Sequence, residues 1–105
     1  MKKIYIAGKV TGLPIIEVEE KFRKVQNEIE QQGFIAVNPI EIVGTWECTW
    51  KEAMIKCISE LINCDAILLL PCWTNSKGAL IEQKLASDLD IRTIIGTKDL
   101  KRRLK

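Results

Sequence analysis

Histidine is absent from the 105 residues, and the four cysteines do not have the spacing of metal ligands. They are separated by nine, seven and eight residues, at Cys48, Cys57, Cys64 and Cys72. This pattern matches neither a C-x-x-C zinc site nor a small scaffold held by disulfides. We therefore expect reduced thiols, a cytoplasmic location, no metal ion and no cofactor.

Long apolar runs and a strong charge of one sign are also missing. No stretch approaches the roughly 18 apolar residues that form a membrane-spanning helix. The opening MKKIYIAG has too short an apolar stretch for a signal peptide. The formal net charge of +2 is too small to indicate a nucleic-acid partner, and the basic segment KDLKRRLK is interpreted as a solvated helix end. We expect neither a membrane nor a nucleic-acid polymer as a partner.

The sequence does contain a regular alternation of strand and helix patterns. Hydrophobic residues make up 47% of the chain and charged residues 29%, as in a single globular domain over residues 1–105. Apolar runs predict strands at 3–7, 34–39, 66–70 and 91–96. Helical spacing predicts helices at 17–32, 50–63 and 76–91, with a short basic helix at the C-terminus. This order predicts an open parallel α/β sheet, flavodoxin-like or Rossmann-like, with strand order 2-1-3-4 and helices on both faces.

One acid has an unexpected position on the predicted helix 76–91. The helix gathers apolar residues on one side, namely Ala79, Ile81, Leu85, Ala86 and Leu89. Glu82 falls near the middle of this arc, where burial of a charge is costly. It also lies near the carboxyl ends of strands 1 and 3, where ligands bind in sheets of this order. We interpret Glu82 as a functional carboxylate. The alternative is a buried acid tied to a backbone amide or a lysine.

Further candidates lie on the loops of the same edge. The segment GKVTG, Gly8 to Gly12, follows the first strand, where Rossmann-like proteins bind phosphate, but it is neither G-x-G-x-x-G nor a P-loop. Its amides, with Lys9 and Thr11, could hold an anion or a polar ring, and an ordinary tight turn explains it equally well. The chain has three tryptophans, at Trp46, Trp50 and Trp73. Each could stack on a flat ring or cover a small core. The candidate substrate-binding residues from these loops are Gly8, Lys9, Thr11, Gly12 and Trp73.

Four stretches, KIYIAGKVTG, VNP, CDAILLLPCW and SKGALIE, resemble the nucleoside 2-deoxyribosyltransferases and the 2′-deoxynucleoside 5′-monophosphate N-glycosidases. The resemblance spans nearly the whole chain and is nearest to small bacterial and phage members. It implies a nucleoside or nucleotide substrate, a homo-oligomer and a glutamate that attacks the anomeric carbon of deoxyribose. Glu82, four residues after Gly78, matches that nucleophile, and Ser76 matches the phosphate-binding serine of the glycosidases. Tyr5 and Gly8 match residues that line the sugar and base pocket.

The resemblance breaks at Cys57. The enzymes carry an essential aspartate there, eight residues before the acid that opens the third strand, here Asp65. A thiol is a poor substitute for a carboxyl that handles the proton of the departing base. Glu47, Glu52 or Glu60 could take over this role, whereas Asp65 is interpreted as structural. Three alternatives stay open: an N-glycosidase or deoxyribosyltransferase, a non-catalytic nucleotide-binding protein, and a purely structural role.

Overall fold

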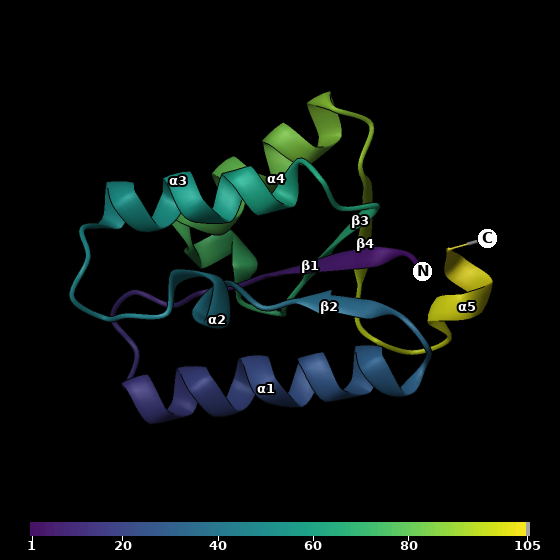
Figure 1. The fold of residues 1–105 in the computed structure, drawn as a ribbon, viewed down its shortest axis with the longest axis horizontal. Helices are drawn as coiled ribbons and strands as arrows, with labels where there is room; N and C mark the ends of the chain where they lie inside the picture. The colour runs from purple at the N-terminus through teal and green to yellow at the C-terminus, as the bar shows by residue number, and fades with distance from the viewer. Residues whose placement is uncertain (105) are drawn as a thin grey trace.

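The computed structural model describes residues 1–104 and contains one parallel sheet with helices on both faces (Figure 1). Its strands are β1 (Lys3–Ala7), β2 (Ile35–Val37), β3 (Ala66–Leu69) and β4 (Arg92–Ile95). They pair in the order β2-β1-β3-β4, and each neighbouring pair is parallel. The predicted fold class and strand order are confirmed.

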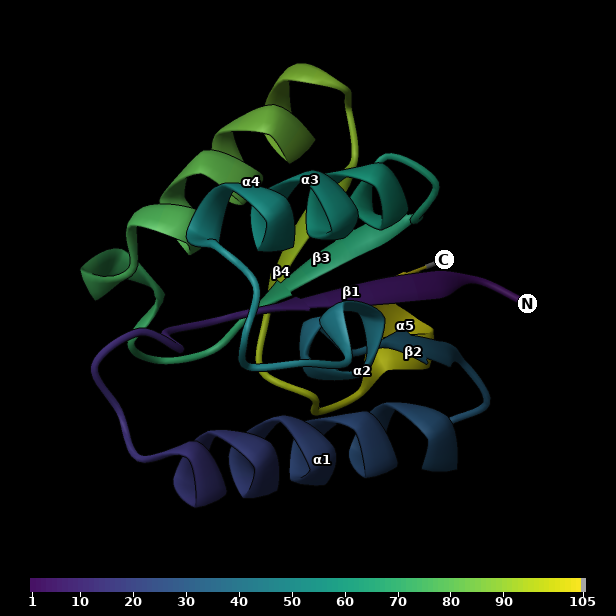
Figure 2. The same cartoon turned by 60° about the vertical axis from the view of Figure 1, so that its left-hand side comes forward.

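The helices form two layers around this sheet. They are α1 (Ile15–Gln31), α2 (Pro39–Val43), α3 (Trp50–Leu61), α4 (Lys77–Asp88) and α5 (Leu100–Arg103), with a 3₁₀ turn η1 (Trp73–Asn75). Helices α1 and α5 pack on one face and α3 and α4 on the other, while α2 lies beside α3 near β2 (Figure 2). No helix within residues 1–104 is both long and apolar enough to cross a membrane.

Alternate residues of β1 supply the two cores of the protein. Ile4 and Ile6 belong to the cluster that packs under α1 and α5, whereas Tyr5 and Ala7 belong to the cluster under α3 and α4. Successive side chains of a strand point to opposite faces, so a central strand covered on both sides is apolar throughout. Tyr5 consequently brings a hydroxyl group into the layer between the sheet and α4.

Some element boundaries differ from the sequence prediction. Helix α1 begins at Ile15 rather than at residue 17, directly after Pro14. The periodicity did not predict α2 or η1, because five and three residues are too few to show it. Helix α2 is instead defined at its ends: the Asn38 Oδ1 accepts a hydrogen bond from the backbone N of Ile40 (2.9 Å), and Gly44 closes it with a φ of 71°.

We predict that Asn38→Ala destabilises the protein by about 1–3 kcal/mol, because it removes the α2 cap and a buried hydrogen-bonding side chain. The Asn38 side chain is 4% exposed, and its Nδ2 also donates to Gln26 Oε1 (3.1 Å). Urea denaturation measures the change in the free energy of unfolding. The matched control is Asn27→Ala at an exposed position of α1. Equal stabilities for the two variants would show that this cap does not hold α2.

Candidate functional site

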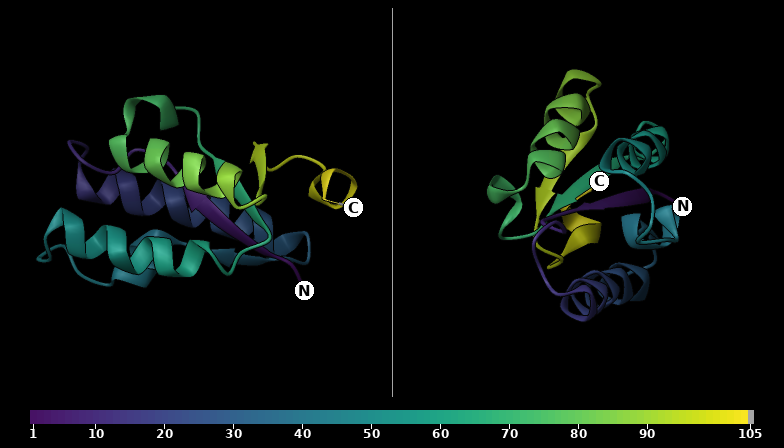
Figure 3. Two further views of the ribbon diagram at one scale, coloured as in Figure 1. Left: turned by 90° about the horizontal axis from the view of Figure 1, so that it is seen from above. Right: turned by 90° about the vertical axis from the view of Figure 1, so that its left-hand side faces the viewer.

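A cavity of about 770 Å³ opens beyond the carboxyl end of β1. It is bounded by the β1–α1 loop, by α2 and the segment after it, by α3, and by the start of α4. The right-hand view of Figure 3 faces this edge of the sheet, with α3 and α4 on one side and α1 on the other. This is the strand edge at which ligands bind in open parallel sheets.

Tyr5 and Glu82 form a buried hydrogen-bonded pair in the lining of this cavity. The Tyr5 hydroxyl donates to Glu82 Oε2 over 2.5 Å. Tyr5 is fully buried in β1 and Glu82, on α4, is 6% exposed. The inward position predicted for Glu82 is confirmed, and its partner is a phenol rather than a backbone amide or a lysine.

The apolar arc predicted for α4 is only partly right. Ala79, Glu82 and Ala86 are its buried residues, whereas Ile81 and Leu89 are 39% and 48% exposed. The buried stripe is therefore one carboxylate between two small residues at helical spacing. Ala79 also lines the cavity beside Glu82, whereas Ala86 is packed in the core under α3 and α4.

Burial sets the proton affinity of both members of the pair. Loss of contact with water raises the pKa of Glu82 from 4.5 to about 7, against the opposing effect of the hydrogen bond from Tyr5. Burial, with the added effect of the Glu82 charge, raises the pKa of Tyr5 far above its ordinary value. Near neutral pH the pair is therefore a neutral phenol donor and a carboxyl that is about half ionised.

The Cys57 thiol, on α3, lines the same cavity. Burial raises its pKa to about 11; the Tyr5 side chain opposes this effect and the Glu82 charge adds to it. The thiol consequently keeps its proton at neutral pH. Cys57 and Glu82 thus line the same cavity, and the charge of Glu82 acts on the thiol.

The other acids considered from the sequence do not join this site. Glu47, Glu52 and Glu60 are outside the lining, which over residues 1–104 contains no carboxylate except Glu82. Glu52 is committed to a capping box, in which its Oε1 accepts from the backbone N of Thr49 (3.1 Å). Asp65 accepts from the backbone N of Lys3 (2.8 Å), next to the amino end of β1, so its role there is structural.

The GKVTG segment contributes four predicted residues to the lining: Gly8, Lys9, Thr11 and Gly12. A Cβ at Gly8 would lie 2.7 Å from Leu70 Cδ1 and 3.0 Å from Leu70 Cβ, so the Leu70 side chain, directly after β3, leaves no space for one unless it shifts. The carbonyl of Lys9 accepts from Lys21 Nζ (2.9 Å), which ties the segment to α1. Lys9 is one of the lining residues and brings a positive charge to this end of the cavity.

The start of α4 supplies Ser76, Lys77 and Gly78 to the lining. Ser76 caps the helix, because its Oγ accepts from the backbone N of Ala79 (3.2 Å). A Cβ at Gly78 would lie 3.2 Å from Met54 Sδ, so the lack of a side chain lets α4 approach α3 closely. The helix N-terminus and Lys77 together make this part of the cavity favourable for an anion.

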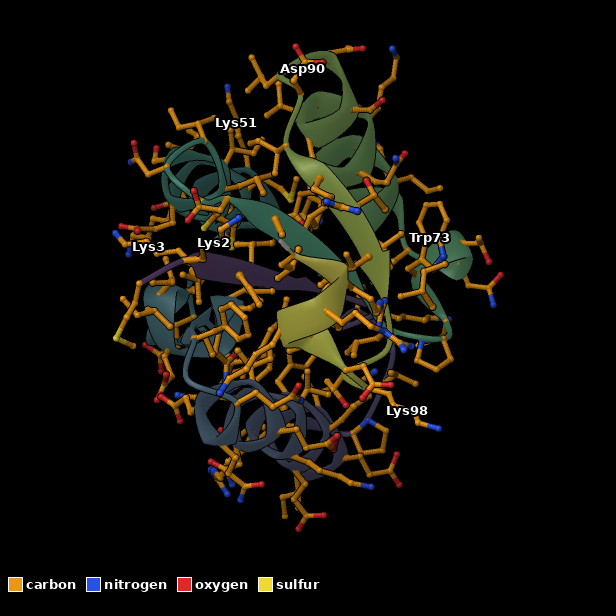
Figure 4. All side chains as sticks on the ribbon, turned by 90° about the vertical axis from the view of Figure 1, so that its right-hand side faces the viewer. Lys2, Lys3, Lys51, Trp73, Asp90 and Lys98 are labelled. Carbon is orange, nitrogen blue, oxygen red and sulfur yellow. The ribbon has the colours of Figure 1, made fainter. Side chains whose placement is uncertain are left out.

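The tryptophans separate into two groups, and Trp73, a predicted substrate-binding residue, is not among the residues that line the cavity. Trp46 and Trp50 line the cavity and are about half exposed, at 43% and 46%. Trp73 lies outside the lining. It belongs to η1, packs against the core under α3 and α4, and is seen at the flank of the molecule in Figure 4. The turn after β3 carries it away from the cavity.

The two lining tryptophans are each anchored to a neighbouring helix. Trp46 Nε1 donates to Glu19 Oε2 on α1 at 3.5 Å, and Lys77 Nζ lies 5.0 Å from the centroid of the Trp50 ring. Trp46 thereby connects the segment between α2 and α3 to α1, and Trp50 connects the start of α3 to the start of α4. No periodic signal in the sequence distinguished these two tryptophans from the third.

Fold and site define an open parallel α/β protein with a ligand cavity that contains a buried tyrosine–glutamate pair. The chain belongs to the family described as Domain of unknown function (DUF4406), whose sequence profile matches residues 2–95. The match includes the pair and every lining element of the cavity. No curated protein matches the sequence.

We predict that Glu82→Gln stabilises the protein at pH 8 by an amount on the order of 3 kcal/mol, because the folded-state pKa of Glu82 is raised from 4.5 to about 7. Between these pH values the folded state binds more protons than the unfolded state, so wild-type stability falls as the pH rises and the full penalty applies above pH 7. Glutamine keeps an acceptor for Tyr5 without the charge.

Urea denaturation at pH 4.5 and pH 8 measures this difference. The increase in the free energy of unfolding of Glu82→Gln over wild type should be large at pH 8 and close to zero at pH 4.5. Glu20→Gln, at an exposed position of α1, is the matched control and should show no such pH dependence. An equal effect of Glu82→Gln at both pH values would contradict a desolvated carboxylate.

Proposed function

We propose that this chain cleaves the N-glycosidic bond of a deoxynucleoside or its 5′-monophosphate, as an N-glycosidase or deoxyribosyltransferase with Glu82 as nucleophile. The observation that carries the proposal is the Tyr5–Glu82 pair in the lining of a cavity at the ligand-binding edge of the sheet. The resemblance of the KIYIAGKVTG and SKGALIE stretches supports the same chemistry.

The geometry of the pair suits nucleophilic attack. Tyr5 donates to Glu82 Oε2, which leaves Oε1 to attack the anomeric carbon while the carboxylate is held in one orientation. The base departs, a covalent glycosyl ester forms on Glu82, and water or a second base then releases the sugar. Because the phenol stays neutral, it can support the carboxylate as a donor throughout.

The rest of the lining supports a nucleotide-sized ligand. A volume of about 770 Å³ is within the range of small-molecule sites. Lys9, Lys77 and the amino end of α4 offer positive charge for a 5′-phosphate. Trp46 and Trp50 offer flat apolar surfaces for a base.

A non-catalytic nucleotide-binding protein is the second candidate, and Cys57 favours it. A thiol with a pKa of about 11 holds its proton too tightly for efficient general acid catalysis near neutral pH. Calorimetry that shows nucleotide binding without turnover would support this candidate.

The homo-oligomer and the cytoplasmic location expected from the sequence stay predictions.

We predict that the wild type releases free base from at least one member of a panel of deoxynucleosides and their 5′-monophosphates, measured by chromatography. Glu82→Gln should lower the rate by a factor of about 1,000 or more, since it removes the nucleophile. A glycosyl adduct on Glu82 should be detected by mass spectrometry after rapid quenching. Glu20→Gln should retain the wild-type rate. Equal release by wild type and Glu82→Gln, or no release at all, would contradict the proposal.

We predict that kcat/KM rises about tenfold per pH unit below pH 7 and levels off above it, because attack requires ionised Glu82, whose pKa is about 7. In Tyr5→Phe the midpoint of this profile should move to higher pH, since the hydrogen bond from Tyr5 lowers the Glu82 pKa. The measurement is the pH profile of base release at low substrate concentration. A midpoint near pH 4.5 in the wild type would show that Glu82 is not desolvated in the working enzyme.

A further inference from the structure

The cavity contains a nucleophile but lacks an acid suited to protonating a departing base. Within residues 1–104, Glu82 is its sole carboxylate, and Tyr5 already holds that group. The remaining ionisable groups of the lining are the ammonium groups of Lys9 and Lys77 and the thiols of Cys48 and Cys57. A second carboxyl group, the usual general acid of glycoside cleavage, is therefore missing from the lining within residues 1–104.

The Cys57 thiol is poorly suited to this role. Burial raises the pKa of Cys57 to about 11, whereas general acid catalysis works best with a pKa near the working pH. The candidates from the preceding loop and the same helix, Glu47, Glu52 and Glu60, lie outside the lining. A neutral nucleoside must gain a proton on its base as the N-glycosidic bond breaks, and this site offers no efficient source for it.

The aromatic side of the cavity carries features that suit a positively charged ring. Trp46 and Trp50 line it, and aromatic faces attract cations. At Trp50 this position is already taken by the Lys77 ammonium, 5.0 Å from the ring centroid, which leaves Trp46 as the aromatic face for a cationic ring. The Trp46 indole lies beside the Glu19 carboxylate, with Nε1 to Oε2 at 3.5 Å. A cationic ring stacked on Trp46 would meet an aromatic face whose indole donates to the Glu19 carboxylate, although Glu19 itself is outside the cavity lining.

We infer that the preferred substrates are N-glycosides whose ring is already cationic, such as N7-alkylated purine deoxynucleosides or pyridinium nucleosides. The inference rests on the proposed function and names its substrate class. Its chemistry needs no acid: a Glu82 oxygen bonds to the anomeric carbon, the carbon–nitrogen bond breaks, and its electron pair neutralises the ring, which leaves uncharged. Water then attacks the anomeric carbon, Glu82 is regenerated as a carboxylate, and one proton passes to solvent.

The test compares 2′-deoxyguanosine with N7-methyl-2′-deoxyguanosine, and likewise their 5′-monophosphates, which differ only in the methyl group and the ring charge. Each enzymatic rate is divided by the spontaneous rate of the same compound, because the cation is intrinsically less stable. We expect the wild-type rate enhancement for the cationic member to exceed that for the neutral member by about 100-fold, the usual scale of a missing general acid. This comparison needs no variant.

A variant tests the cause of the preference. Cys57→Asp supplies a carboxyl beside Glu82 and should raise the rate with the neutral nucleoside by about tenfold or more, which narrows the ratio between the two substrates. Cys48→Asp, at the other thiol of the lining, is the matched control and should leave the ratio wide. If the Cys57→Asp protein folds but the ratio of rate enhancements for the cationic and neutral substrates stays the same, position 57 is not where the missing acid would act.

The outcomes separate this inference from the proposed function. Equal enhancement of the two purine substrates, or cleavage of other panel members without the cationic one, would overturn the inference while the glycosidase assignment stands. Failure to cleave any N-glycoside would overturn the proposed function and the inference with it. A wild-type rate enhancement that is much larger for the cationic than for the neutral substrate supports both the inference and the proposed function.

Discussion

The hydrogen bond between the Tyr5 hydroxyl and Glu82 is the interaction on which the candidate site depends. It joins the central strand to α4 across 77 residues of sequence and lies in a buried layer. A carboxylate in such a position is costly unless a donor satisfies it. Within residues 1–104, every fully buried side-chain nitrogen or oxygen has a hydrogen-bond partner, so the pair fits a well-satisfied interior.

Burial of this pair also costs the protein stability. The hydrogen bond from Tyr5 favours the charged carboxylate, yet desolvation outweighs it and raises the pKa of Glu82 to about 7. This cost must be offset by the burial of apolar side chains in the two clusters on either side of the sheet, to which alternate residues of β1 contribute. A carboxylate kept at such a cost is more easily explained by chemistry than by folding.

The sequence predicted the parts of this structure that repeat and missed those that depend on single contacts. Strand order follows from apolar runs alternating with helical spacing, and the inward position of Glu82 follows from its place among Ala79 and Ala86. Helix α2 is too short for periodicity and is set by the Asn38 cap. The position of Trp73 outside the cavity lining was not predictable, because the η1 turn redirects the chain after β3 and nothing in local spacing encodes that direction.

The same dry environment acts in one direction on both ionisable groups that face Tyr5. Burial raises the pKa of Glu82 to about 7 and that of Cys57 to about 11. Sites that use one group as nucleophile and another as acid instead place them in environments that separate their pKa values around neutrality. In this cavity the two pKa values are not separated around neutrality. Glu82 can ionise near neutral pH, whereas Cys57 holds its proton too tightly to donate it readily. Under the proposed function, such a cavity would favour a substrate whose ring can leave without gaining a proton.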